Sequence, residues 1–378
     1  MYVMMGGVSA IHHNVGKEIK QKMMKIDKEL GTFAIYGGLL LGGGGGGSIA
    51  GGKQVLELML SYSKQVEVLP IDAFEDEAMV VSASLVGSPA SKDSFISPKH
   101  YGGVFDLLKK NYHRTIQGII TNEMGAQSST NGWVLAAMTG LPLIDAPCNG
   151  RAHPTGIMGS LCLHKFPEYR SVQVCAGGNK DKDIQLYVQG SIQHAAQQIR
   201  NASTSAGGFV TVLRNPVSIS HTKRYAAIGA FSWSIQIGKI LYENLGNVDA
   251  VLDGLKTMLP IQAAFKGKIS SFKLKTLGGF DRGKVTIKGN GCEAQITFWN
   301  EYIDLELDGT QYATFPDLIV LIDTRTGMPL TSDILETGQE VMIAVVPKTA
   351  LILGKTMYDS ELLEEVKQII NEIKNYEA

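Results

Sequence analysis

The most restrictive feature of this sequence is a stretch of 22 uncharged residues, Gly31 to Gly52, of which 11 are glycine. The stretch is long enough to cross a bilayer, but glycine supplies no side-chain area and loses much backbone entropy in a helix. We therefore expect no transmembrane segment here. Glycine makes up 43 of the 378 residues, and no short repeat accounts for this excess over the usual share of roughly 7%. The glycines predict tight loops and close backbone contacts.

The six consecutive glycines from Gly42 to Gly47 partly match a phosphate-binding loop. Gly47, Gly52 and Lys53 have the required spacing, but Gln54 stands where the motif needs a hydroxyl group to hold magnesium. We therefore rank nucleotide hydrolysis below two other interpretations: backbone amides of the run contact a ligand, or the run lets a strand and a helix approach closely. The candidate ligand-contacting residues are Gly44, Gly45, Gly46 and Gly47.

Charge and cysteine content exclude several classes of protein. The 35 basic and 36 acidic side chains give a net charge of −1, and no stripe of Lys and Arg is present, so we expect no nucleic-acid partner. The four cysteines form no C-x-x-C pair, which argues against a disulfide scaffold and a zinc ribbon. We predict a cytoplasmic protein, with no membrane partner and with a small-molecule substrate.

Apolar strand-like segments alternate with helical patterns over residues 1–265, which predicts an α/β domain with a mostly parallel sheet. The predicted strands include Val66–Ile71, Met79–Leu85, Gly118–Thr121, Pro142–Ile144, Val172–Cys175 and Phe209–Leu213. The predicted helices include Val15–Leu30, Lys53–Lys64, Val104–Tyr112, Trp133–Thr139, Ile184–Gln198 and Ala227–Glu243.

The pattern changes after about residue 265. Short, partly alternating segments in residues 266–350 are separated by turn signals such as Gly278-Gly279 and Asp308-Gly309, which predicts an all-β lobe, a small barrel or sandwich. Residues 351–378 end in a charged amphipathic helix that is capped by Asp359 or Ser360.

The densest group of chemically active residues lies in Leu143–Thr155, directly after a predicted strand. Glu123 follows a second strand, and open α/β sheets bind ligands at the carboxyl ends of their strands. An acid, a thiol, a guanidinium and an imidazole can supply a base, a nucleophile, an anion clamp and a proton shuttle. Each residue alone also fits a polar turn, but the cluster favours a functional site. Its members are Asp145, Cys148, Asn149, Arg151 and His153.

Two further interpretations stay open at this point. Cys148 and His153, with Asp145 or His164, could ligate zinc, although their spacing matches no metal motif. In the β lobe, Asn300 and Glu301 stand at a strand end, where turn duties explain polar residues about as well as ligand contacts.

The order and spacing of several segments are similar to one known family. It is the family named for S-methyl thiohydantoin desulfurase, whose members are also described as hydantoinase-related. The resemblance covers about Gly37 to Pro347. The matching segments are Leu41 to Gly47, Asn122-Glu123-Met124-Gly125, Asp145 to Pro154, Gly278-Gly279-Phe280-Asp281-Arg282-Gly283, Asn300-Glu301 and Phe315-Pro316-Asp317-Leu318-Ile319.

The resemblance implies a three-layer α/β domain joined to a β-barrel-like domain. It also implies hydrolysis at C2 of an S-methylated thiohydantoin, which expels methanethiol and leaves a hydantoin. The family pattern has a second acid and a glutamate where this sequence has Pro147 and Thr155.

These observations give two hypotheses. In the first, the chain hydrolyses a C–S or C–N bond of a hydantoin-like ring. Asp145 or Glu123 takes a proton from water or from Cys148, and Arg151 pairs with a substrate carboxylate. His153 protonates the leaving group, and the glycine amides face negative charge on the ring. In the second, suggested by Pro147 and Thr155, the chain is a non-catalytic metabolite-binding subunit of a hydantoinase-type complex. A homo-oligomer or such a partner is expected.

Overall fold

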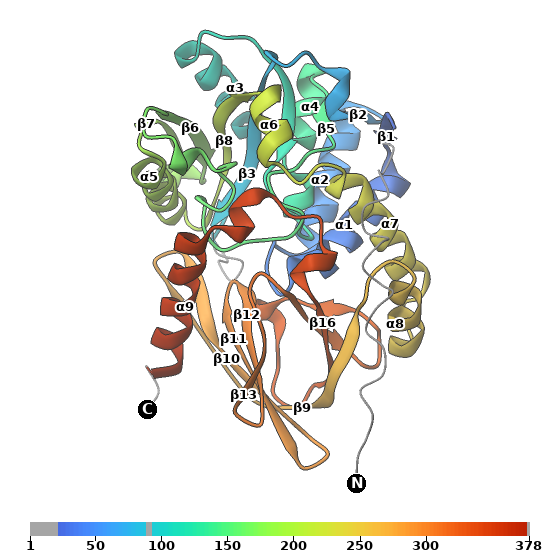
Figure 1. Cartoon of the computed structure of the whole chain (residues 1–378). Helices are drawn as coiled ribbons and strands as arrows, with labels where there is room; N and C mark the ends of the chain where they lie inside the picture. Colours follow the sequence, from blue (N-terminus) through green and yellow to red (C-terminus); the bar gives the residue numbers. More distant parts are fainter. Residues whose placement is uncertain (1–21, 88–92, 376–378) are drawn as a thin grey trace.

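Two eight-stranded sheets form the frame of the molecule (Figure 1). The computed structural model describes residues 22–87 and 93–375. The first sheet has the order β1 (Met24–Ile26), β2 (Val66–Leu69), β5 (Leu143–Ile144), β4 (Ile116–Thr121), β3 (Met79–Gly87), β8 (Phe209–Ser218), β6 (Ser171–Gly177) and β7 (Ile184–Gly190). The second has the order β13 (Thr310–Thr314), β12 (Glu301–Leu307), β11 (Cys292–Trp299), β10 (Phe280–Gly289), β9 (Gln262–Leu277), β16 (Glu340–Val346), β14 (Leu318–Asp323) and β15 (Pro329–Leu330).

The first sheet is mixed and has a parallel centre. Strands β2, β5, β4 and β3 run parallel to one another, whereas β1, β8, β6 and β7 pair antiparallel with their neighbours. The prediction of a mostly parallel sheet is therefore confirmed only for the four central strands. The antiparallel pairing of β6 with β7 follows from the short connection between them, because a parallel pair needs a long crossover.

The predicted helix Ile184–Gln198 is wrong in its first half. Residues 184–190 form strand β7, in which every second residue is apolar, and this strand pairs with β6. Helix α5 (Ile192–Ser205) begins after Ser191, whose hydroxyl oxygen accepts a hydrogen bond from the backbone N of His194. Apolar residues alternate in residues 184–190 and take helical spacing directly after them. The sequence analysis did not separate the two patterns.

The chain before the glycine run also differs from its prediction. Residues 15–21 of the predicted helix Val15–Leu30 lie outside the described residues, and the next element is strand β1. Helix α1 (Lys28–Gly42) begins after Asp27, whose side chain caps it. The apolar segment before the glycines is the buried body of this helix. The helix ends at Gly43, whose φ of +54° is in the left-handed region that favours glycine.

Helices and an irregular segment cover both faces of the first sheet, so this part of the molecule has three layers (Figure 1). Alternate residues of β3 enter the two cores: Val81 lies in one and Val80 in the other. None of the helices among the described residues is both long enough and apolar enough to cross a membrane. One face carries α1, α2 (Ile49–Tyr62), α3 (Pro98–Asn111), α4 (Trp133–Thr139), α7 (Ala230–Glu243) and α8 (Val248–Lys256), and the other carries α5, α6 (Ile219–Tyr225) and residues 145–165.

The second sheet is antiparallel throughout its described strands. Its two end strands, β13 and β15, do not pair with each other, so the expected barrel-like domain is an open sheet and not a closed barrel. Helix α9 (Ser360–Asn375) lies along this sheet (Figure 1). Its apolar face, including Val366 and Ile370, packs with Trp299 and Ile303 of the sheet.

The glycine run connects the two sheets. The backbone N of Tyr302 donates to the carbonyl of Gly43 at 2.7 Å, and the backbone N of Ser332 donates to that of Gly44 at 2.8 Å. On the other side, the carbonyl of Gly46 accepts hydrogen bonds from the backbone N of Gln127 and of Ser128. The run is therefore held by both parts of the molecule.

The crossing of α1 and α7 gives a stability prediction. A Cβ on Gly238 would lie 1.8 Å from the backbone oxygen of Phe33, and backbone cannot move aside as a flexible side chain can. Gly238→Ala is therefore expected to lower the free energy of unfolding by about 2 kcal/mol or more. Urea unfolding measures this change in the free energy of unfolding. Gly190→Ala is the control, because a Cβ there meets nothing within 4 Å, and its effect is expected to stay below about 1 kcal/mol. Equal effects of the two substitutions would contradict the prediction.

Candidate active site

A cavity of about 340 Å³ lies between the two sheets, at the carboxyl ends of β3 and β4. This is the edge at which the sequence analysis expects a site. The cavity has an aromatic wall of Phe209, Phe280 and Trp299. Its charged and polar lining residues are Asn122, Glu123, Ser128, His153, Thr155, Gln193, Gln197, Arg200, Arg214, Arg282, Asn300, Glu301 and Glu365.

Glu123 is a carboxyl group that lines the cavity and has a raised pKa. It follows β4, and its Oε2 accepts a hydrogen bond from the backbone N of His153 at 3.1 Å. Burial raises the pKa of Glu123 to about 7, although the His153 hydrogen bond, Ser128 and the cation of Arg214 act in the opposite direction. A carboxyl group with this pKa exchanges its proton near neutral pH, as a general base does.

His153 is held as a neutral imidazole beside Glu123. Its Nδ1 donates to the carbonyl of Thr155 at 2.9 Å, which leaves Nε2 to accept a hydrogen bond from Nδ2 of Asn122 at 3.2 Å. Burial and the charge of Arg214 lower the pKa of His153 to about 3. The ring is therefore no proton donor at neutral pH. Nε2 lies 3.3 Å from Oε2 of Glu123 but carries no proton to donate, so it is the backbone N of His153, and not its ring, that binds the Glu123 carboxyl group.

Arg214 gives the cavity wall a buried positive charge. It lies in β8, its exposed fraction is 3%, and its Nε has no hydrogen-bond partner among the described residues. A Cβ on Gly156 would lie 2.7 Å from Nη1, so the missing side chain there leaves room for the guanidinium. Burial lowers the pKa of Arg214, whereas Cys148 and Glu123 act to raise it. A buried guanidinium with an unsatisfied donor is suited to bind an anion.

Arg200 of α5 joins the two sheets at the cavity. Its Nη1 donates to the carbonyl oxygens of Gly87 and Gly279, both at 3.0 Å. Its guanidinium lies 4.1 Å from the ring centroid of Phe280. Gly87 ends β3 and Gly279 lies in the turn between β9 and β10, so this side chain fixes the aromatic wall against the first sheet.

The structure brings together six of the residues that the sequence analysis proposed for the site. These residues line the cavity and are Gly46, Gly47, Glu123, His153, Asn300 and Glu301. The other six do not line it and are Gly44, Gly45, Asp145, Cys148, Asn149 and Arg151.

Asp145 and Cys148 have other surroundings. Oδ1 of Asp145 accepts hydrogen bonds from the backbone N of Phe231 at 3.0 Å and of Ser232 at 3.2 Å, which caps the first turn of α7. Sγ of Cys148 lies 3.4 Å from Oγ of Ser82 in β3, and burial raises the pKa of this thiol to about 11. The thiol is therefore protonated at neutral pH and is a poor nucleophile.

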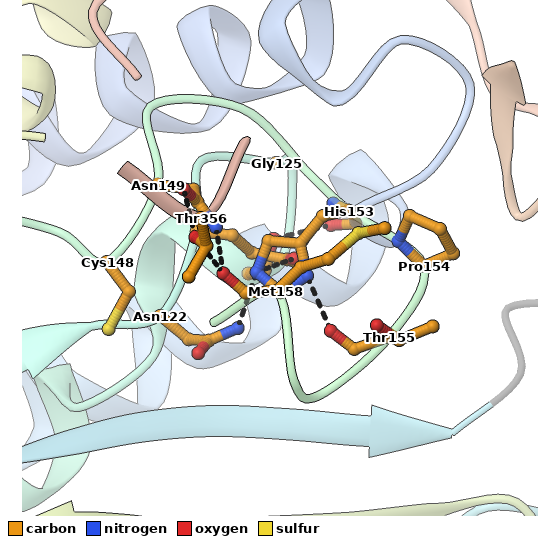
Figure 2. Close-up of polar contacts among 12 residues, drawn as sticks. Asn122, Gly125, Cys148, Asn149, His153, Pro154, Thr155, Met158 and Thr356 are labelled. Carbon is orange, nitrogen blue, oxygen red and sulfur yellow. Dashed lines mark hydrogen bonds and ion pairs between the residues drawn. The ribbon is translucent and has the colours of Figure 1, made fainter. Parts of the chain in front are cut away.

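Asn149 and Arg151 hold the loop in place. Nδ2 of Asn149 donates to the carbonyl of Met158 at 2.7 Å (Figure 2). Nη1 of Arg151 donates to the carbonyl oxygens of Pro316 and Asp317, at 3.0 and 2.6 Å. Arg151 is fully buried, so it fastens the first part of the chain to the second sheet and does not reach the cavity.

Gly44 and Gly45 lie against Tyr302 and Glu301 of the second sheet and do not line the cavity themselves. A Cβ on Gly45 would lie 2.0 Å from Oε1 of Glu301, and one on Gly44 would lie 2.8 Å from the ring of Tyr302. Both positions therefore need glycine so that the second sheet can come this close.

Sequence reasoning missed Arg200 and Arg214. Arg214 left a visible signal, since it is a charged residue inside the apolar strand F-V-T-V-L-R-N-P-V, and such a residue needs a reason to be buried. Arg200 left none, because it sits on a polar, amphipathic helix where arginine is ordinary.

The described residues do not have the geometry that a zinc site or a phosphate-binding loop requires. In the described part of the chain, no group of three or more His, Cys, Asp or Glu side chains is arranged to hold a metal ion. His164 instead lies 2.9 Å from Oδ2 of Asp359. Lys53, the lysine of the partial phosphate-loop motif, has its Nζ 5.6 Å from the ring centroid of Tyr36 in α1 and does not line the cavity.

Comparisons with known proteins identify related sequences and a related fold. The description "S-Me-THD-like, N-terminal domain" matches residues 28–184, and "S-Me-THD-like, C-terminal domain" matches residues 191–357. The crystal structure of a protein from Chromobacterium violaceum is 17% identical to this chain, with a TM-score of 0.71 over 92% of this chain and 97% of that one. It shows a shared fold. No curated protein matches the chain.

The raised pKa of Glu123 predicts how stability changes with pH. The folded state holds this proton up to about pH 7, but the unfolded chain releases it near pH 4.5, so the free energy of unfolding falls as the pH rises between these values. Glu123→Gln has no carboxyl group at this position, so this fall in the free energy of unfolding is absent in the variant. Relative to the unsubstituted protein, the variant is expected to gain about 3 kcal/mol between pH 4 and pH 8.

Urea unfolding at several pH values measures this difference. Glu336→Gln, at an exposed position, is the control and is expected to follow the unsubstituted protein at every pH. A Glu123→Gln difference that is constant across the pH range would contradict the assignment.

Proposed function

The chain belongs to the S-Me-THD-like family, and we propose that it is a hydrolase that cleaves the exocyclic C–S bond of a small S-methyl thiohydantoin-type ring. The observation that carries this proposal is Glu123, a carboxyl group with a pKa of about 7 in the cavity that also contains the buried guanidinium of Arg214, whose Nε has no hydrogen-bond partner among the described residues. A base that works near neutral pH and an anion-binding group are what such a reaction needs.

The proposed reaction consumes one water molecule. The Glu123 carboxylate takes a proton from water while the water oxygen forms a bond to C2 of the ring. The C–S bond then breaks, and the sulfur leaves as methanethiol after it takes up a proton. The second proton of the water moves from the oxygen on C2 to the ring nitrogen that was double-bonded to C2. C2 therefore keeps the oxygen as a carbonyl, and the organic product is a hydantoin. The backbone N of His153, which donates a hydrogen bond to Oε2, holds Glu123 in place for the first step.

We assign substrate binding to the positive charge of Arg214 and to the aromatic wall of the cavity. Arg214 pairs with a carboxylate on the ring substituent, the role that the sequence analysis gave to Arg151. Phe280 and Trp299 lie with their ring centroids 5.1 Å apart and offer apolar surface to a flat heterocycle. Gly46 and Gly47 supply backbone at the floor of the cavity.

Asp145 and Cys148 have no place in this proposal as base and nucleophile. Asp145 caps α7, and the Cys148 thiol faces β3. The thiol groups of all four cysteines are free, which agrees with the proposed cytoplasmic location.

One observation favours the second candidate function, a metabolite-binding subunit of a hydantoinase-type complex. Thr155 lines the cavity at the position where the family pattern has a glutamate, and its buried Oγ1 has no hydrogen-bond partner among the described residues. A hydroxyl group there can bind a ligand but cannot serve as a base. Ligand binding by the purified chain without turnover would support this candidate.

The first activity prediction concerns Glu123. The purified chain is expected to release methanethiol from S-methyl thiohydantoin propionate, and Glu123→Gln is expected to lower kcat by about 100- to 10,000-fold because the general base is lost. Cys148→Ala is expected to stay within about threefold of the unsubstituted chain. Thiol release is followed with a colorimetric thiol reagent. Full loss in Cys148→Ala, or none in Glu123→Gln, would reverse these assignments.

The second prediction concerns the specificity due to Arg214. Arg214→Met is expected to lower kcat/KM for the propionate substrate by about 10- to 100-fold more than for the matching propionamide, because the amide does not need the cation. The ratio of the two substrates is the measurement, since any effect of Arg214 on the pKa of Glu123 applies to both. Lys239→Met, in exposed surface of α7, is the control. An unchanged ratio would show that Arg214 does not bind the carboxylate.

A further inference from the structure

We propose that Glu301 is the general acid of this site and donates the proton that the departing sulfur takes up. This inference rests on the hydrolysis proposed above. That reaction needs a second proton-transfer group, because Glu123 takes a proton in the first step and cannot donate one at the same time. His153 does not fill this role, since both its ring nitrogens are engaged and its pKa is lowered to about 3.

The backbone fixes Glu301 at the cavity. It is the first residue of β12, and the preceding Asn300 has a φ of +58°. Asp281 and Asn300 hold each other: the backbone N of Asp281 donates to Oδ1 of Asn300 at 2.9 Å, and the backbone N of Asn300 donates to the carbonyl of Asp281 at 2.7 Å. The hydroxyl of Ser332 donates to the carbonyl of Asn300 at 2.7 Å. These three hydrogen bonds fix Asn300, and with it the backbone that carries Glu301.

The carboxyl group of Glu301 is buried but has an unused oxygen. The exposed fraction of the residue is 2%, it lines the cavity, and its Oε2 has no hydrogen-bond partner among the described residues. Gly45 lies directly against its Oε1, where no other residue type would fit. A buried polar oxygen without a partner costs free energy, so its retention in the cavity wall indicates that a bound molecule satisfies it.

Burial and the negative charge of Glu123 favour the protonated form of Glu301. The groups that face it are Glu123 from the first sheet, Arg151 from the loop and Arg200 from α5. Burial, together with repulsion from Glu123, raises the pKa of Glu301 well above its usual value, and the two arginines only partly oppose this. Two carboxyl groups that share one buried site do not both ionise easily. One therefore serves as the base and the other keeps its proton.

The two groups come from different sheets, and both line the cavity. Glu123 follows a strand of the first sheet, whereas Glu301 begins a strand of the second. A ring bound between them has the attacking water on the side of Glu123 and the leaving sulfur on the side of Glu301. As the C–S bond breaks, its electron pair stays on sulfur, and the proton of Glu301 forms the S–H bond of methanethiol.

The protons balance over one turnover. Glu301 becomes a carboxylate and Glu123 becomes a carboxylic acid, and one proton returns from Glu123 to Glu301 directly or through water in the cavity. The net change is one water consumed, one hydantoin formed and one methanethiol released.

The test compares leaving groups in the full chain. Glu301→Gln is expected to lower kcat for the S-methyl substrate by about 100-fold or more. For the S-(4-nitrophenyl) analogue, whose thiolate leaves without a proton, the same variant is expected to stay within about tenfold of the unsubstituted chain. Glu123→Gln is expected to be slow on both substrates, because the attack of water needs the base in either case.

Controls separate this role from a structural one. Glu306→Gln is the matched control in the same strand, at a residue bound to Lys374 and outside the cavity. It is expected to match the unsubstituted chain on both substrates. Glu301→Asp keeps a carboxylic acid and is expected to recover part of the S-methyl activity that Glu301→Gln loses.

Each outcome decides a different statement. Equal losses of Glu301→Gln on both substrates, or no loss on the S-methyl substrate, would overturn the role of Glu301 and leave the proposed function in place. No methanethiol release by the unsubstituted chain would overturn the proposed function, and the role of Glu301 with it.

Discussion

The close contact of the glycine run with both sheets is the constraint on which the rest of the structure depends. Gly43 accepts a hydrogen bond from Tyr302 of the second sheet, Gly44 accepts one from Ser332 after β15, and Gly46 accepts two from the loop after β4. Side chains at these positions would collide with Arg151, with Tyr302 and with the backbone of Gly125. Because no side chain intervenes, the two sheets come close enough for residues of both to line one cavity.

This close approach also explains the electrostatics of the site. Arg151, Arg214 and Glu301 are buried and Glu123 is partly buried beside them, so water screens their charges little. Burial raises the pKa of both carboxyl groups and lowers that of His153, and the arginines limit the rise for the acids. The same residue types on an exposed turn would titrate near their ordinary values. The proposed chemistry is therefore a consequence of packing.

Much of the fold could be predicted from local patterns. Trp133–Thr139 is a helix as predicted, and β4 and β5 end where Glu123 and Asp145 were expected. The patterns did not separate β7 from α5, because a period of two passes directly into a helical period at Ser191. They also did not reveal that the second sheet stays open, since the pairing of end strands is decided by distant residues.

The sequence by itself determined the family, the order of the two sheet-forming parts and the location of the site at strand ends. It also placed Glu123, His153, Asn300 and Glu301 among the candidates. Tertiary structure alone decided which of the clustered residues face the cavity. Asp145 and Cys148 lie only 22 and 25 residues after Glu123, yet one caps a helix and the other faces β3. Arg200 and Arg214 come from a helix and a strand far along the chain, and only the fold brings their charges to Glu123. Spacing in a sequence limits which side chains can meet, but burial and the positions of distant charges set which of them can move a proton.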